Sequence, residues 1–226
     1  MNLKIRRFTH RLGWLIAPAL LVTPLAMAAN LTVSVLDKEG NPAADAVVVV
    51  VLNANAGAKT SPVTVTPITT VAQEKMQFIP SVSLVNVGST VRFVNNDPWD
   101  HHVRGTAAGF AAFNAVGGFE LRLDGKPAGK PANSATAVLD KAGAVQLGCH
   151  LHSSMRGYIY VTDSPYTVKT GADGVAQFTD IPEGAATLKV WHADQLIDVA
   201  PQTTYLGTPA AKAGFQLSVV PRRRRI

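Results

Sequence analysis

Short runs of apolar or alternating residues, four to seven residues long, recur along most of the chain. Turn-forming sequences such as Asp173-Gly174 and Pro182-Glu183-Gly184 separate these runs. No window keeps an apolar period of 3.6 residues for more than two turns, so helices are not expected. Many short strands with turns at this spacing are typical of a β-sandwich or barrel, and we predict an all-β protein. The predicted strands span 31–36, 46–52, 82–87, 90–94, 137–140, 144–148, 157–162, 175–178 and 186–192.

The first 28 residues have the pattern of a secretory signal peptide. A basic start precedes an apolar run over 12–26, which ends in the small-x-small sequence Ala26-Met27-Ala28. The apolar run contains Pro18 and Pro24 and is shorter than the roughly 20 residues that a bilayer requires. We therefore predict export to the periplasm with cleavage after Ala28, and no stable membrane span in the mature protein.

The excess of basic over acidic residues lies at the two ends of the chain. The sequence has 21 lysines and arginines against 15 acidic residues. Four of the basic residues lie in the predicted signal peptide, and four more, Arg222 to Arg225, lie in a basic tail at 221–226. The body between the two ends is therefore slightly acidic, which argues against nucleic acid as a partner.

Cys149 is the one cysteine in the sequence. An exported protein with a single cysteine cannot form an internal disulfide, and a free thiol outside the cytoplasm is open to oxidation. Cys149 is therefore expected to be either buried and inert or bound to a partner.

The neighbours of this cysteine have the spacing Cys149-x-x-His152-x-x-Met155. The segment lies between two predicted strands, so a loop can turn all three side chains toward one point, whereas a strand would direct alternate ones to opposite faces. Two imidazoles, a thiolate and a distant axial methionine form a blue-copper electron-transfer site. Zinc also accepts cysteine and histidine but has little use for a thioether, so the methionine favours copper. A second imidazole is needed, and the pair His101-His102 lies upstream.

The region around these histidines resembles the cupredoxins, in particular plastocyanin and amicyanin. Those proteins have an asparagine at the end of a strand and a histidine ligand six residues later, which matches Asn95 and His101. The resemblance therefore selects His101, with His102 as the alternative. Cupredoxins usually have an asparagine at the position of His102, and that asparagine braces the ligand loop.

The resemblance covers about residues 71–162 and implies a Greek-key β-sandwich with one type 1 copper. The implied ligands are His101, Cys149, His152 and Met155, and the spacing of the last two is similar to the short loop of amicyanin. The implied function is one-electron transfer to or from a periplasmic redox partner, such as a dehydrogenase or a cytochrome.

The flanks of this region have a second resemblance. Residues 31–52 and 170–190 look like two halves of a carboxypeptidase-regulatory-like (transthyretin-type) sandwich. About a hundred residues separate the halves, which predicts that the cupredoxin sandwich is inserted in the second sandwich or lies beside it. The predicted division is a signal peptide at 1–28, a split sandwich at 29–66 and 163–220, a cupredoxin domain at 67–162 and the basic tail at 221–226.

Two other functions fit the same sequence. One is a periplasmic copper-binding protein for copper delivery or buffering, and the other is a structural double sandwich without redox work. The chain as a whole is similar to bacterial proteins labelled methylamine utilization or plastocyanin-like proteins, a label that assigns no substrate. No catalytic triad, phosphate loop or pair of catalytic carboxylates stands out, and too few histidines remain for the second copper site of a copper oxidase. We therefore do not expect an enzyme.

Overall fold

The computed structural model describes residues 28–53, 68–108 and 118–222, and these residues form strands and connections without a helix. The predicted all-β class is thus confirmed. No described residue belongs to a helix that could cross a bilayer. Nearly all of the predicted signal peptide, the predicted boundary at residues 66 and 67 and most of the basic tail lie outside the described residues. The strands are β1 (Ala28–Leu36), β2 (Val47–Leu52), β3 (Thr69–Glu74), β4 (Gln77–Ile79), β5 (Val82–Asn86), β6 (Ser89–Asn95), β7 (His101–Ala107), β8 (Phe119–Leu123), β9 (Asn133–Leu139), β10 (Gly143–Cys149), β11 (Arg156–Thr162), β12 (Thr167–Lys169), β13 (Val175–Pro182), β14 (Gly184–Trp191), β15 (Gln202–Leu206) and β16 (Ala211–Gln216).

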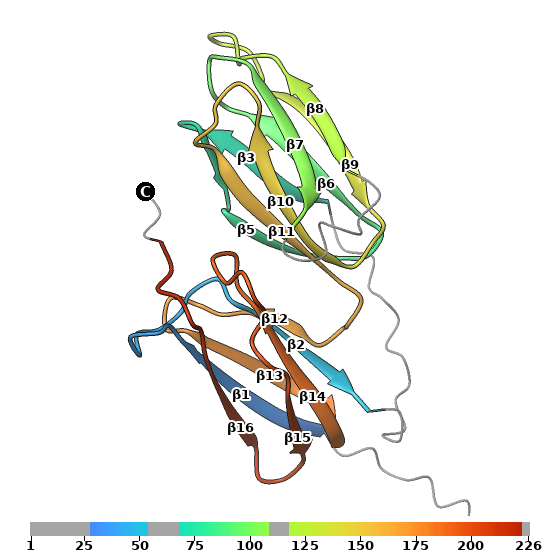
Figure 1. Ribbon diagram of the computed structural model, residues 1–226. Helices are drawn as coiled ribbons and strands as arrows, with labels where there is room; N and C mark the ends of the chain where they lie inside the picture. The colour runs from blue at the N-terminus through green and yellow to red at the C-terminus, as the bar shows by residue number, and fades with distance from the viewer. Residues whose placement is uncertain (1–27, 54–67, 109–117, 223–226) are drawn as a thin grey trace, which may run out of the picture.

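The strands pair into four sheets that form two sandwiches (Figure 1). The central sandwich consists of the sheets β5-β11-β10-β7-β8 and β4-β3-β6-β9. The flanking sandwich consists of the sheets β13-β1-β16 and β12-β2-β14-β15, so it uses strands from both sides of the central one in the sequence.

Strands β2 and β12, which precede and follow the central sandwich in the sequence, lie next to each other. Strand β2 pairs antiparallel with β12, with Val49 opposite Thr167. Just before β12, the backbone N–H of Val50 donates to the carbonyl of Tyr166 at 2.8 Å, and the Ser164 hydroxyl donates to the Val50 carbonyl at 2.8 Å. The segment between β2 and β12 can therefore fold as a separate sandwich without separating the strands on either side of it.

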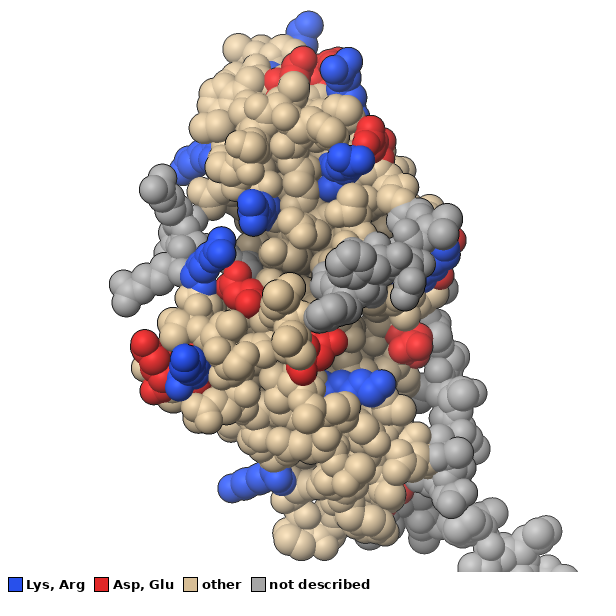
Figure 2. Space-filling model, in the orientation of Figure 1, with Lys and Arg blue, Asp and Glu red and all other residues tan. Residues whose placement is uncertain are grey.

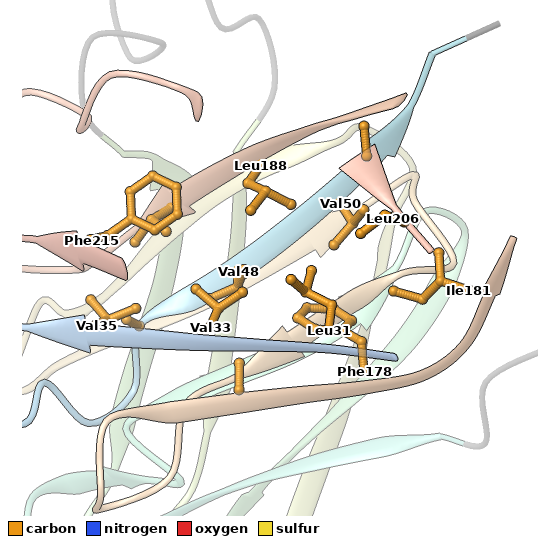
Figure 3. Packing of buried hydrophobic residues seen from close by; sticks show 14 of the residues in the cluster. Leu31, Val33, Val35, Val48, Val50, Phe178, Ile181, Leu188, Leu206 and Phe215 are labelled. Carbon is orange, nitrogen blue, oxygen red and sulfur yellow. The ribbon is translucent and has the colours of Figure 1, made fainter. Parts of the chain in front are cut away.

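The flanking sandwich has a continuous apolar core. In β1 the buried residues alternate with more exposed ones, because successive side chains of a strand point to opposite faces. Each fully buried aliphatic side chain stabilises the fold by about 1.5–3 kcal/mol. Figure 3 shows the side chains of the two sheets packed against each other, among them Leu31, Val33, Val35, Val48, Val50, Phe178, Ile181, Leu188, Leu206 and Phe215.

The central sandwich has its own apolar core, which extends to the end of the sheet where Cys149 lies. Phe93, Val103, Leu147 and Ile159 are fully or almost fully buried in it. Cys149 and Met155 belong to the same cluster of buried side chains. The residues around Cys149 are therefore held by close packing as well as by the backbone ladder.

The two sandwiches touch along the outer face of β11. The ring of Trp191 lies 5.8 Å from that of Tyr158 and 5.4 Å from that of Tyr160, measured between centroids. The Lys169 ammonium donates to the Val82 carbonyl at 3.1 Å and pairs with Asp45 at 2.6 Å. The strand that follows the predicted ligand loop is therefore packed on both of its faces.

Charged side chains are spread over both sandwiches. Figure 2 shows lysines and arginines interspersed with acidic residues on the face that it draws. Neither sign forms a continuous patch there, which is the usual arrangement of a solvated protein surface.

Candidate metal centre

Two neighbouring strands position the residues of the candidate site. His101 is the first residue of β7 and Cys149 is the last residue of β10, and the two strands are antiparallel with Val103 opposite Cys149. The chain then turns back into β11. In this turn, the Met155 N–H donates to the His152 carbonyl at 3.0 Å. This tight turn keeps His152 close to the end of β10.

Three potential ligand atoms converge at this end of the central sandwich. The Cys149 Sγ lies 3.6 Å from His101 Nδ1 and 3.7 Å from His152 Nδ1, and the two Nδ1 atoms are 3.1 Å apart. His101 is fully buried, Cys149 is a buried free cysteine, and His152 is partly exposed. The structure thus brings together a thiol and two imidazoles, with all three ligand atoms within 4.8 Å of one another.

The geometry of these three atoms fits a single metal ion. Given the three separations, a point in their plane lies about 2.0 Å from each atom, close to the roughly 2.0–2.3 Å of bonds from zinc to imidazole nitrogen and thiolate sulfur. Each of the three atoms can offer an electron pair, the sulfur as a thiolate and each Nδ1 in the ring tautomer that has its proton on Nε2. A cation at the common point would bind all three.

The fourth predicted ligand and the alternative histidine have different surroundings. Met155 is 1% exposed and packs in the same apolar cluster as Cys149. His102 points out of the sandwich, where its Nε2 lies 3.4 Å from a carboxylate oxygen of Glu120. The structure therefore brings His101, and not His102, into the group with Cys149 and His152.

Asp97 is a residue of the site that the sequence analysis missed. Its Oδ2 lies 2.9 Å from His101 Nε2, and both side chains are buried. A carboxylate accepts hydrogen bonds, so Nε2 has the proton in the neutral ring, and Nδ1 is left as the electron-pair donor that faces Cys149. A carboxylate on the far nitrogen of a metal-binding imidazole fixes the orientation of the ring and makes it a stronger ligand. In the sequence, the feature that could have pointed to Asp97 is the presence of an acidic residue four positions before His101.

Further hydrogen bonds keep the Asp97 side chain charged. Burial raises the pKa of this carboxyl, but hydrogen bonds from the Met76 N–H, from His101 and from the Lys75 N–H lower it by more, so the pKa is below its ordinary value. Lys75 and Met76 form the turn between β3 and β4, and both have positive φ angles. Asp97 therefore joins this turn to the buried histidine.

Asn95 holds the segment between β6 and His101 in place. Its side-chain amide donates to the carbonyls of Trp99, Leu123 and Asp124 at 2.8, 3.3 and 3.0 Å, and its Oδ1 accepts the Asp97 N–H at 2.9 Å. On the other side of the site, the carbonyl of His102 accepts the His150 N–H at 3.0 Å. The ligand loop is thus braced through the backbone of His102, where the cupredoxin pattern has an asparagine side chain.

Substituting Gly125 with alanine is expected to disturb the loop that precedes His101. An added Cβ would collide with the Pro98 carbonyl oxygen and lie 2.9 Å from the backbone nitrogen of Trp99, neither of which can rotate away. We expect the free energy of unfolding of the metal-free protein to fall by about 1–3 kcal/mol, measured by urea denaturation. Gly214→Ala is the matched control, since nothing lies within 4 Å of its added Cβ. Equal stabilities for the two variants would contradict this account.

Comparison with known proteins adds a structural likeness. No family model matches the chain. No curated protein matches it either. Amicyanins are among the similar solved structures. A Cu(I) form of an amicyanin variant is 20% identical, with 42% of this chain and 82% of that chain covered and a TM-score of 0.34. A second Cu(I) variant is 19% identical, with 50% and 99% covered and a TM-score of 0.34, and an oxidised variant is 18% identical, with 50% and 99% covered and a TM-score of 0.35.

Amicyanin is one of the cupredoxins that the sequence resembles. At these identities and TM-scores, the chemistry of the site has to be argued from its own atoms.

Proposed function

We propose that the protein is a blue copper protein of the cupredoxin type that transfers single electrons in the periplasm, with one type 1 copper held by His101, Cys149, His152 and Met155. The observation that supports this most is the convergence of one buried thiol and two ring nitrogens on a common point. One thiolate and two imidazoles in a trigonal arrangement are the donor set of such a site. Copper bound there would supply one-electron chemistry by alternating between Cu(I) and Cu(II).

The side chains around the site favour electron transfer with little movement. His101 is fully buried and hydrogen-bonded to Asp97, so its ring is fixed before any ion binds. Cys149 ends a strand that is paired on both sides, and its sulfur is shielded from water by the apolar cluster. His152 is the more exposed of the two histidines, and we assign its edge as the place where electrons enter and leave.

The proposed role is that of an electron carrier for a periplasmic dehydrogenase or cytochrome, not that of an enzyme. Among the described residues, His101, Cys149 and His152 are proposed as ligands. Asp97 and Asn95 hold a ligand or its loop in place. None of these groups is left over as the acid or base that a hydrolytic or proton-transfer reaction would require.

Addition of one equivalent of Cu(II) to the purified mature protein tests the proposal. An intense blue colour is expected, because a thiolate ligand to Cu(II) in a trigonal site is the hallmark of a blue-copper centre. A colourless complex that a chelator strips readily would instead favour copper delivery or buffering, and no binding would favour a structural role. Fractionation of cells that express the full chain tests the location, and retention of the unprocessed protein in the cytoplasm would contradict export.

A further inference from the structure

A second group of potential metal ligands lies on the outer face of the central sandwich. Successive residues alternate between the two faces of a sheet, so His102 and His150 point outward where His101 and Cys149 point inward. The His150 N–H donates to the His102 carbonyl at 3.0 Å, which makes the two residues cross-strand neighbours. Their rings stack with centroids 4.8 Å apart and planes inclined by 30°.

A carboxylate from a third strand completes this outer group. Glu120 of β8 lies opposite Arg104 of β7, two pairs along from His102 and therefore on the same face of the sheet. Its two oxygens lie 3.4 Å from His102 Nε2 and 3.8 Å from His150 Nε2. The side chains of the three residues are 25%, 44% and 51% exposed for His102, His150 and Glu120, so an ion can reach them from solvent.

We propose that His102, His150 and Glu120 form a second, solvent-accessible site for a divalent transition-metal ion of the Zn²⁺ and Cu²⁺ type. Two imidazole nitrogens and one carboxylate oxygen are ligands that these ions bind well, whereas Mg²⁺ and Ca²⁺ prefer oxygen alone. Bonds of about 2.0–2.2 Å to one ion require the donor atoms to lie roughly 3–3.5 Å apart. The observed separations of 3.4 and 3.8 Å join the two histidines to different oxygens of Glu120, so the three partly exposed side chains have to rotate for their donor atoms to meet at one ion.

Arg104 competes with the ion for the Glu120 carboxylate. Its Nε lies 3.3 Å from the Glu120 oxygen that faces His150. The guanidinium therefore occupies part of the coordination space of the carboxylate, and its positive charge opposes a cation there. The site is consequently expected to bind a metal more weakly than the buried one, and to bind it more tightly when Arg104 is removed.

Calorimetric titration of the metal-free mature protein with Zn²⁺ tests the proposal. Two binding events are expected, of which Cys149→Ser weakens only the buried one. His150→Asn should weaken the outer event at least tenfold, and the double variant His102→Asn with His150→Asn should abolish it. Circular dichroism of each variant checks the fold, which these substitutions outside the apolar core should preserve. If only the outer binding event is observed, the proposed copper function is overturned and the proposal for the outer site stands.

Arg104→Gln gives a test in the opposite direction. It should tighten the outer event several-fold, because Glu120 loses its ion-pair partner. Arg122→Gln is the matched control, since it removes the same charge from the neighbouring position opposite His102 and should have a smaller effect. The proposal is overturned if no Zn²⁺ binding survives Cys149→Ser, if the double variant binds as the natural protein does, or if Arg104→Gln weakens the outer event.

Discussion

Replacing Cys149 with serine is expected to abolish the blue colour of the copper-loaded protein and to leave its fold intact. A serine hydroxyl is a hard, neutral ligand that cannot replace the soft thiolate of a type 1 site. The fold should survive because the hydroxyl would lie between two imidazole nitrogens, His101 Nδ1 and His152 Nδ1, and both can form hydrogen bonds with it. A visible spectrum after addition of Cu(II), with circular dichroism of the same sample, measures both effects.

Met155→Leu is the contrasting variant for this experiment. Leucine has a similar volume, so the packing around position 155 should be kept. We expect this variant to bind copper and remain blue, with a changed reduction potential, because the axial ligand tunes that potential. A Cys149→Ser protein that stays blue would show that the ligand set is wrong.

Asp97→Asn is expected to weaken copper binding by about 10–100-fold and to raise the reduction potential. The carboxylate on His101 Nε2 makes the imidazole a stronger donor, which stabilises Cu(II) more than Cu(I). The amide of asparagine keeps the shape but removes the negative charge. It also leaves one of the three donors to Asp97 poorly paired, so unfolding of the metal-free protein should require about 1–3 kcal/mol less. A chelator competition, a redox titration and a urea denaturation measure these changes.

Asp100→Asn is the control, because the side chain of Asp100 is exposed and accepts the Gly125 N–H without touching His101. A pH series gives a further test. The pKa of Asp97 is lowered in the folded state, so its stabilising effect is complete above the unfolded-state pKa of about 3.9 and is lost as the pH falls through the folded-state pKa. The natural protein should therefore lose more stability in acid than Asp97→Asn does. Identical potentials for the Asp97→Asn and natural proteins would remove the carboxylate from the account.

The strands that could be predicted are those whose own residues alternate or form apolar runs. All nine predicted runs fall on observed strands, with ends that differ by a few residues. The other seven strands were missed: β3, β4, β7, β8, β12, β15 and β16. Three of them, β7, β15 and β16, have sequences that mix histidine, arginine, glutamine, lysine, threonine and glycine. These segments become strands by pairing with a neighbour. Strand β16, for example, lies parallel to β1 with Phe215 opposite Val35. Such pairing depends on residues distant in the sequence, so local pattern cannot predict it.

The site shows the same division between local and distant information. The spacing from Cys149 to Met155 is local, and it predicted one neighbourhood for a thiol, an imidazole and a thioether. The contact of Asp97 with His101 depends on Asn95, which fastens the intervening loop to the carbonyls of residues 123 and 124. The outer group depends on the register between β7, β8 and β10. Neither register nor loop closure can be obtained from spacing alone.

The hydrogen bonds of Val50 with Tyr166 and Ser164 mean that the flanking sandwich holds the chain before and after the central sandwich side by side. A domain inserted between neighbouring strands can be removed without disrupting the host fold, since only a short linker would be needed to join those two strands. The flanking sandwich can thus accept or lose the central one in a single genetic step, without redesign of its own core.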